Sequence, residues 1–234
     1  PPLSLYVHVP WCVQKCPYCD FNSHQVRDAL PEKPYIAALI ADLEAALPQV
    51  WGRKIVSVFF GGGTPSLLSG EGLDMLLTAL RTRLPILPEA EITLEANPGT
   101  AESGKFAAFR AAGVSRLSLG IQSFDDAFLA RIGRIHGGSE ARRAAELAAK
   151  HFDTFNLDLM HALPGQTLAQ ALADVDTALG FGPPHLSCYH LTMEPNTTFG
   201  ASPPAGLPDD DSAADIQEAI EARLARAGFE HVVD

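Results

Sequence analysis

The chain has 234 residues, of which 17 are Lys or Arg and 28 are Asp or Glu, so its formal net charge is −11. Hydrophobic residues make up 47% and charged residues 19%, a balance that excludes an intrinsically disordered chain and allows one large α/β domain. The acidic charge argues against nonspecific binding to nucleic acid or to an anionic membrane surface. No segment approaches ~18 uninterrupted apolar residues, so we expect no membrane span.

Short apolar runs that are rich in β-branched or aromatic residues alternate with longer amphipathic stretches, and each run is typical of a strand. The six runs cover 3–9, 54–60, 91–96, 115–121, 154–160 and 185–191. Several lack polar alternation, as expected of parallel strands buried on both faces.

The stretches between the runs have apolar residues at helical spacing. They cover 35–47, 72–84, 103–112, 139–150 and 168–179. Ser69 and Thr167 stand where N-caps belong, and Gly113 and Gly180 stand where helices end. Six βα units predict an α/β fold, a partial (β/α)6 TIM-like barrel that is open on one side.

The domain organisation is indicated by a change in composition after the last strand. Residues 199–211 contain three prolines, two glycines and three acids, so we interpret them as a linker after a barrel at 1–198. A final acidic helix is expected at 212–227. We interpret 212–234 as the start of a truncated C-terminal domain.

Three of the four cysteines lie together in a Cys-x-x-x-Cys-x-x-Cys motif directly after the first strand: Cys12, Cys16 and Cys19. The first residues lack the features of a secretion signal, so clustered thiols indicate a metal site in a reducing cytoplasm. Three thiolates suit a 4Fe–4S cluster with one iron left open for a small ligand. Zinc is an alternative, because His24 would complete a Cys3His set, and three unrelated buried cysteines are another.

A second motif, Gly-Gly-Gly-Thr-Pro at 61–65, comes directly after the second strand. Glycines without a Cβ let the backbone approach a ligand closely, and active sites of barrels lie at this end of the strands. An ordinary turn with surplus glycine is the alternative.

Together these motifs resemble the radical S-adenosylmethionine (SAM) superfamily. YVHVPWC, CPYCDFNSH, GGGTPS, LEANPGT, LGIQSF, RIGRIH and DLMHALPGQT resemble its oxygen-independent coproporphyrinogen oxidase branch, and are most similar to the HemW-type haem chaperones of that branch. The resemblance runs over nearly the whole chain. It implies that the three cysteines hold a 4Fe–4S cluster and that SAM chelates the open iron.

The resemblance also implies which residues contact SAM. They are Tyr6, Tyr18, Gly62, Gly63, Thr64, Glu95, Gln122, Arg134 and Asp158. For Glu95 and Asp158 the sequence itself favours contact with a ligand. A carboxylate inside an apolar strand is costly unless it is paired or bound to a ligand. For Arg134, the sequence alone favours a surface arginine.

The function implied is a cytoplasmic haem chaperone that binds haem and passes it to acceptor proteins, with an electron donor serving the cluster. One rival is a coproporphyrinogen III oxidase, which would convert propionates to vinyls with a deoxyadenosyl radical. That branch has a further cysteine where this chain has Phe21, and this substitution puts the enzymatic activity in doubt. The other rival is a zinc-binding structural module.

Overall fold

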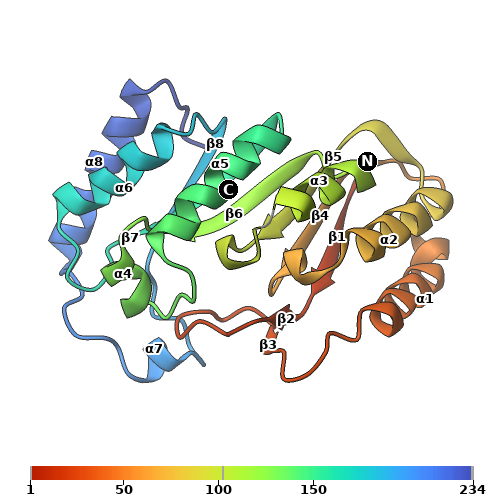
Figure 1. Cartoon of the computed structure of the whole chain (residues 1–234), viewed down its shortest axis with the longest axis horizontal. Coiled ribbons are helices and arrows are strands. Elements are labelled where there is room, and N and C mark those ends of the chain that lie inside the picture. The colour runs from red at the N-terminus through yellow and green to blue at the C-terminus, as the bar shows by residue number, and fades with distance from the viewer. Residues whose placement is uncertain (1, 102, 233–234) are drawn as a thin grey trace.

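The computed structural model describes residues 2–101 and 103–232. In this part of the chain six parallel strands form one sheet, in which the strand order follows the chain order (Figure 1). They are β1 (Leu3–Val9), β4 (Ile55–Gly62), β5 (Ile86–Ala96), β6 (Arg116–Gln122), β7 (Thr154–His161) and β8 (His185–His190). All neighbouring pairs are parallel, so every connection crosses back over the sheet, and the six expected strands are confirmed.

Helices cover one face of this sheet (Figure 1). The longer ones are α1 (Glu32–Val50), α2 (Gly70–Arg83), α3 (Ser103–Ala112), α5 (Gly138–His151), α6 (Leu168–Leu179) and α8 (Asp210–Arg226). The expected N-caps are present, since Ser69 accepts from the Gly72 N–H and Thr167 from the Gln170 N–H. The side-chain oxygens of these caps satisfy donors that have no partner within the helix.

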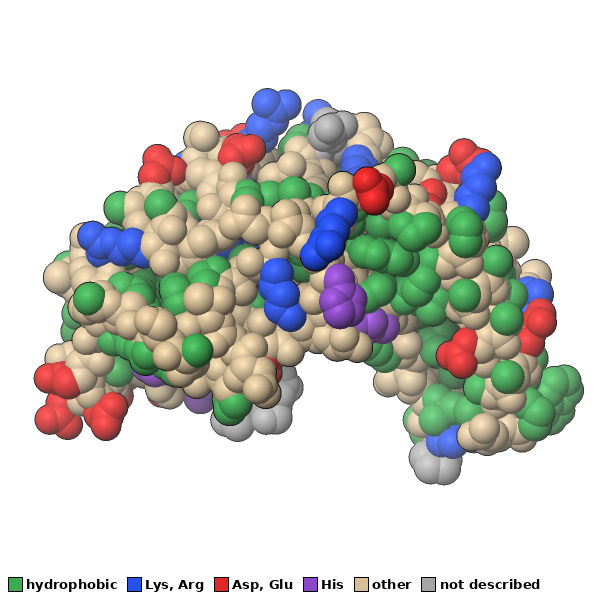
Figure 2. Space-filling view, turned by 90° about the horizontal axis from the view of Figure 1, so that it is seen from below, with side chains coloured by type: hydrophobic (Ala, Val, Ile, Leu, Met, Phe, Trp, Pro, Cys, Tyr) green, Lys and Arg blue, Asp and Glu red, His purple; other side chains and the backbone are tan. Residues whose placement is uncertain are grey.

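The sheet is curved, and only its outer face is fully covered. Residues of the strands that point to the helices are buried, as Phe60, Leu94 and Leu119 are at 0% exposure. On the inner face Tyr6 keeps 56% and Phe59 keeps 38% of its surface exposed. Seen from below, the molecule is an arch with an open hollow (Figure 2). The predicted partial barrel is confirmed.

The segment after β8 packs more closely than a linker would. The short helix α7 (Thr198–Ala201) lies within it, and Phe199 is buried in a small apolar cluster with Phe128 and Met160. Helix α8 contributes Ile216 and Ile220 to the main core. The division into a barrel at 1–198, a linker and a further domain from 212 stays a prediction.

No helix in the described residues is long and apolar enough to cross a membrane.

Several elements differ from the expected ones. Strand β5 begins five residues earlier than expected. Helix α1 also begins earlier, before Pro34. The first turn of a helix tolerates proline, because a backbone N–H at that position would have no partner within the helix. Four short helices and two short strands were not expected. They are β2 (Trp11–Cys12), β3 (His24–Gln25), α4 (Asp126–Arg131), α7 and the 3₁₀ turns η1 (Pro65–Leu67) and η2 (Pro98–Thr100).

Candidate functional site

The cysteine loop begins where β1 ends. Its base is closed by the pairing of β2 with β3, in which the His24 N–H donates to the Pro10 carbonyl at 2.7 Å and the Val26 N–H to the Cys12 carbonyl at 2.9 Å. A turn at the tip brings the Cys19 N–H to 3.2 Å from the Cys16 carbonyl. The loop therefore turns at its tip and returns to its own base rather than running extended.

The three thiols of the motif are free and lie close enough to influence one another. Cys12 is buried, and Cys16 and Cys19 are half-buried. Burial raises the pKa of the Cys19 thiol, and the thiols of Cys16 and Cys12 raise it further. Three such soft sulfur donors on one loop are the ligand type that an iron–sulfur cluster takes, so the loop fits this cofactor.

The structure does not form the Cys3His zinc site that the sequence offers as an alternative. Across residues 2–101 and 103–232, no three His, Cys, Asp or Glu side chains are close enough to hold a single metal ion. His24, which would complete a Cys3His set, is exposed in β3. In a 4Fe–4S cluster each thiolate binds a different iron, so the three sulfurs of the loop need not meet at a single ion.

The glycine run at the end of β4 contacts the segment that leads into the cysteine loop. The Gly63 N–H donates to the Val9 carbonyl and the Thr64 N–H to the Trp11 carbonyl, both at 2.7 Å. The Gly62 N–H donates to Oε2 of Glu95 at 3.2 Å. The run therefore holds the cysteine loop and one of the predicted acids with its own backbone groups.

Glu95 and Asp158 lie on the inner face of the sheet, near the end of β5 and in the second half of β7. Burial, and then the charge of Asp158, raise the pKa of Glu95 to about 7, against the lowering effect of the Gly62 N–H. Burial raises the pKa of Asp158 to about 6, although Asn156 donates to its carboxylate at 2.6 Å and Ser118 at 3.3 Å. Two acids with raised pKa values, one of which acts electrostatically on the other, are typical of a ligand site.

Arg134 links the cysteine loop to the end of β6. One guanidinium nitrogen, Nη1, lies 3.5 Å from both the Cys16 sulfur and the Tyr18 hydroxyl, and Nη2 donates to the Gly120 carbonyl at 2.7 Å. Its Nε is buried and has no hydrogen-bond partner among the described residues. Arg134 is not the surface arginine that the sequence alone favours, because the chain folds its side chain back over β6. The unpaired Nε–H is suited to the carboxylate of a ligand.

Gln122 has a backbone conformation that is unusual for a residue with a side chain. Its φ is +69°, and the register of β6 on β7 shifts between Gly120 and Gln122. A Cβ on Gly120 would lie 3.1 Å from Nε2 of Gln122 and 3.3 Å from Nη2 of Arg134, so the two side chains converge over this glycine. Such backbone strain gathers at ligand sites.

The two predicted tyrosines approach this site from different sides. Tyr6 on β1 is exposed on the inner face, where its ring stacks on Phe59 and its hydroxyl lies 3.2 Å from Nδ1 of His8. Burial and the charge of Glu95 raise the pKa of Tyr6. Tyr18 is half-buried beside Arg134, and burial raises its pKa. Both tyrosines thus border predicted ligand residues.

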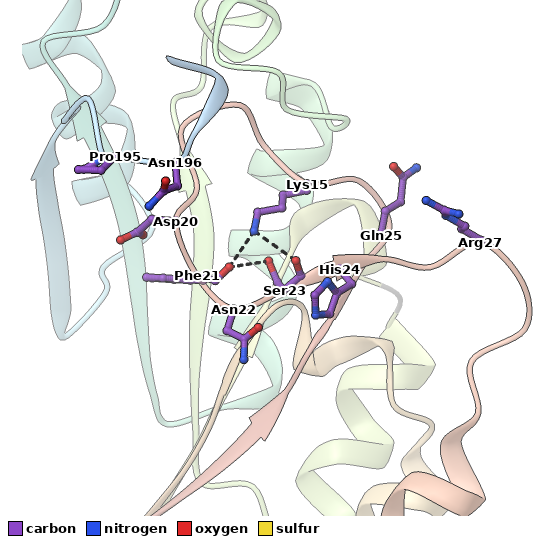
Figure 3. A pocket seen from close by; sticks show the side chains of 10 residues that line it. All are labelled: Lys15, Asp20, Phe21, Asn22, Ser23, His24, Gln25, Arg27, Pro195 and Asn196. Atoms are coloured by element: carbon purple, nitrogen blue, oxygen red, sulfur yellow. Dashed lines mark hydrogen bonds between the residues drawn. The ribbon is translucent and has the colours of Figure 1, made fainter. Parts of the chain in front are cut away.

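An open pocket of about 1040 Å³ lies beside the cysteine loop. Its lining comprises Lys15, Asp20, Phe21, Asn22, Ser23, His24, Gln25, Arg27, Pro195 and Asn196 (Figure 3). Lys15 donates to the carbonyls of Phe21 at 2.8 Å and Ser23 at 3.2 Å, while the Phe21 ring points away from His24 (Figure 3). None of the residues expected to contact SAM lines this pocket.

Comparison with known proteins places these features in a family. The model of the radical SAM superfamily matches residues 6–178. The chain belongs to the radical SAM superfamily. It is 53% identical to the "Heme chaperone HemW" of Escherichia coli K12 and 51% identical to that of Haemophilus influenzae, over 98% of this chain and 61% of each relative. The chain thus spans about three fifths of the length of these relatives.

A solved structure of a related enzyme has the same architecture. The radical SAM enzyme coproporphyrinogen III oxidase (HemN) from Escherichia coli superposes with a TM-score of 0.88 at 29% identity, over 98% of this chain and 54% of the enzyme. The family implies a 4Fe–4S cluster and SAM as cofactors. The FeFe-hydrogenase maturase HydG, at 16% identity and a TM-score of 0.63, shares the fold.

Sequence reasoning missed the polar residues that support the site. Ser118 and Asn156 hold Asp158, and Nε2 of His136 donates to the Ile121 carbonyl at 3.1 Å. The only signal was a polar residue inside an apolar strand run, as in the sequence FNLDL. That signal does not say which neighbour the side chain contacts.

Proposed function

We propose that this chain is the cofactor-binding part of a haem chaperone. It binds a 4Fe–4S cluster through Cys12, Cys16 and Cys19, holds SAM beside it, takes haem as cargo and passes the haem to acceptor proteins. The similarity to two haem chaperones at 51–53% identity, against 29% to the oxidase, supports this cargo. The free, clustered thiols need a reducing compartment, so we propose a cytoplasmic location and a one-electron donor for the cluster.

The residues of the inner face would hold SAM between two acids and a guanidinium. Glu95 and Asp158 have acceptor oxygens for hydroxyl groups, and Nε of Arg134 has a donor for a carboxylate. Gln122 stands between them, while Tyr6 and Tyr18 border the site. Gly62 and Gly63 add no side-chain bulk at the end of β4, and the N–H groups of Gly62, Gly63 and Thr64 hold Glu95 and the start of the cysteine loop beside it. When bound, the cluster supplies the electron that SAM cleavage requires.

The alternative is the oxidase reaction, and Phe21 is the observation against it. This residue stands where the oxidase branch has a further cysteine, and its side chain is 57% exposed at the rim of the open pocket. A radical reaction needs the substrate in near-attack geometry, and a misplacement of ~1 Å can slow it ~100-fold. A chain that differs from the oxidase branch just after its third cysteine can still bind SAM and yet fail to hold the substrate in near-attack geometry.

One anaerobic experiment separates the two functions. Reconstituted protein is incubated with SAM, a reductant and coproporphyrinogen III for product analysis, and a second sample is titrated with haem and mixed with apomyoglobin. A haem chaperone gives a saturable Soret band and haem transfer without repeated turnover. Formation of several equivalents of protoporphyrinogen would overturn the proposal in favour of the oxidase.

A further inference from the structure

The strained end of β6 is held by partners from two other parts of the chain. Nη2 of Arg134 donates to the Gly120 carbonyl, and the imidazole of His136 lies 3.1 Å from the Ile121 carbonyl. These contacts fix the strand before Gln122. The two residues after Gln122 are held by a different group, on helix α6.

That group is the carboxylate of Asp174, which is only 6% exposed. Its Oδ2 accepts from the Ser123 hydroxyl at 2.6 Å, and its Oδ1 accepts from the Phe124 N–H at 2.8 Å. Ser123 is completely buried, and its Oγ also accepts from the Asp125 N–H at 3.1 Å, next to the N-terminus of α4. A buried carboxylate with two short, charge-assisted bonds fixes its partners firmly.

We propose that Asp174 is a positioning residue for SAM, and that it acts through Ser123 and Phe124 to hold Gln122 in its left-handed conformation. A non-glycine residue with positive φ persists only where its surroundings impose that conformation. Gln122 precedes the two residues that Asp174 binds, so a loosened segment lets Gln122 relax away from Arg134. The inference rests on the SAM site proposed above.

The test measures SAM affinity of the anaerobically reconstituted protein by equilibrium dialysis, together with iron content and melting temperature. Asp174→Asn presents an NH2 group in place of one acceptor oxygen, and we expect SAM to bind about tenfold more weakly while the iron content is unchanged. Ser123→Ala removes one of the two bonds and serves as the milder variant. Thr167→Ala, which removes the N-cap of the same helix, is the matched control for stability alone.

A double-mutant cycle distinguishes positioning from general destabilisation. If Asp174 acts through Gln122, Asp174→Asn adds almost nothing to the loss of SAM affinity in Gln122→Ala. Equal losses in Thr167→Ala and Asp174→Asn, or additive losses in the double variant, would overturn the positioning role. Failure of the wild-type protein to bind SAM would instead overturn the proposed site itself.

Discussion

A Cβ atom on Gly63 would lie 2.5 Å from the carbonyl oxygen of Trp11. The partner in this close approach is backbone, which cannot move aside as the end of a flexible side chain can. Trp11 directly precedes the first cysteine of the motif. The room that glycine leaves at this position is therefore taken by the chain itself, at the base of the cysteine loop.

The first prediction concerns this contact. In Gly63→Ala the new methyl group pushes Trp11 and Cys12 away, so we expect the cluster content after anaerobic reconstitution to fall by half or more, with SAM binding reduced in parallel. Iron and sulfide analysis measures the loss. Gly104→Ala is the control, since a Cβ there has no atom of the described residues within 4 Å. A full cluster in Gly63→Ala would show that the loop tolerates the displacement.

The sequence predicted the sheet well because parallel strands buried on both faces leave continuous apolar runs. The strands at 3–9 and 154–160 match β1 and β7 to within one residue. The pairing of β2 with β3 was not predictable, since two-residue strands have no periodicity. The burial of Arg134 was also hidden, because it depends on a carbonyl 14 residues away and on a thiol 118 residues away.

The second prediction concerns the cysteines. Cys16→Ala removes one of three thiolates on the loop, so we expect reconstituted protein without a 4Fe–4S absorption band. Cys188 is on β8, outside the cysteine loop, and is no part of its set of thiolates. Cys188→Ala should therefore retain full iron and sulfide content. The assignment fails if Cys16→Ala still assembles the cluster.

The third prediction separates the charge of Arg134 from its shape. Arg134→Gln removes a positive charge 3.5 Å from the Cys16 sulfur, so the reduced, more negative cluster loses stabilisation and its reduction potential becomes more negative. Arg134→Lys keeps the charge but cannot span Cys16 and Gly120 as a planar fork does. We expect both variants to bind SAM at least ~10-fold more weakly, a loss of ~1.4 kcal/mol.

A redox titration monitored by electron paramagnetic resonance gives the potentials for this comparison, and equilibrium dialysis gives the SAM affinities. The potential should shift in Arg134→Gln and stay near the wild-type value in Arg134→Lys. Equal potentials in all three proteins would mean that the guanidinium does not act on the cluster electrostatically.

The last prediction is a pH dependence of stability that comes from Glu95. The pKa of this carboxyl rises from 4.5 to about 7 on folding, so between these values the folded protein binds more protons than the unfolded chain. Stability that is present below pH 4.5 is therefore lost as the pH rises toward 7. One pKa unit corresponds to ~1.4 kcal/mol, so the loss is at most about 3–4 kcal/mol, and less because Glu95 is only half-buried.

Glu95→Gln removes this titration, so without SAM the variant should be more stable than the wild-type protein at pH 8 and similar to it near pH 4.5. Urea unfolding at several pH values measures the difference. Glu146→Gln, which removes an exposed carboxyl on α5, is the control and should match the wild-type curve. A Glu95→Gln variant that parallels the wild-type protein from pH 4.5 to 8 would show that Glu95 is ionised in the folded state throughout this range.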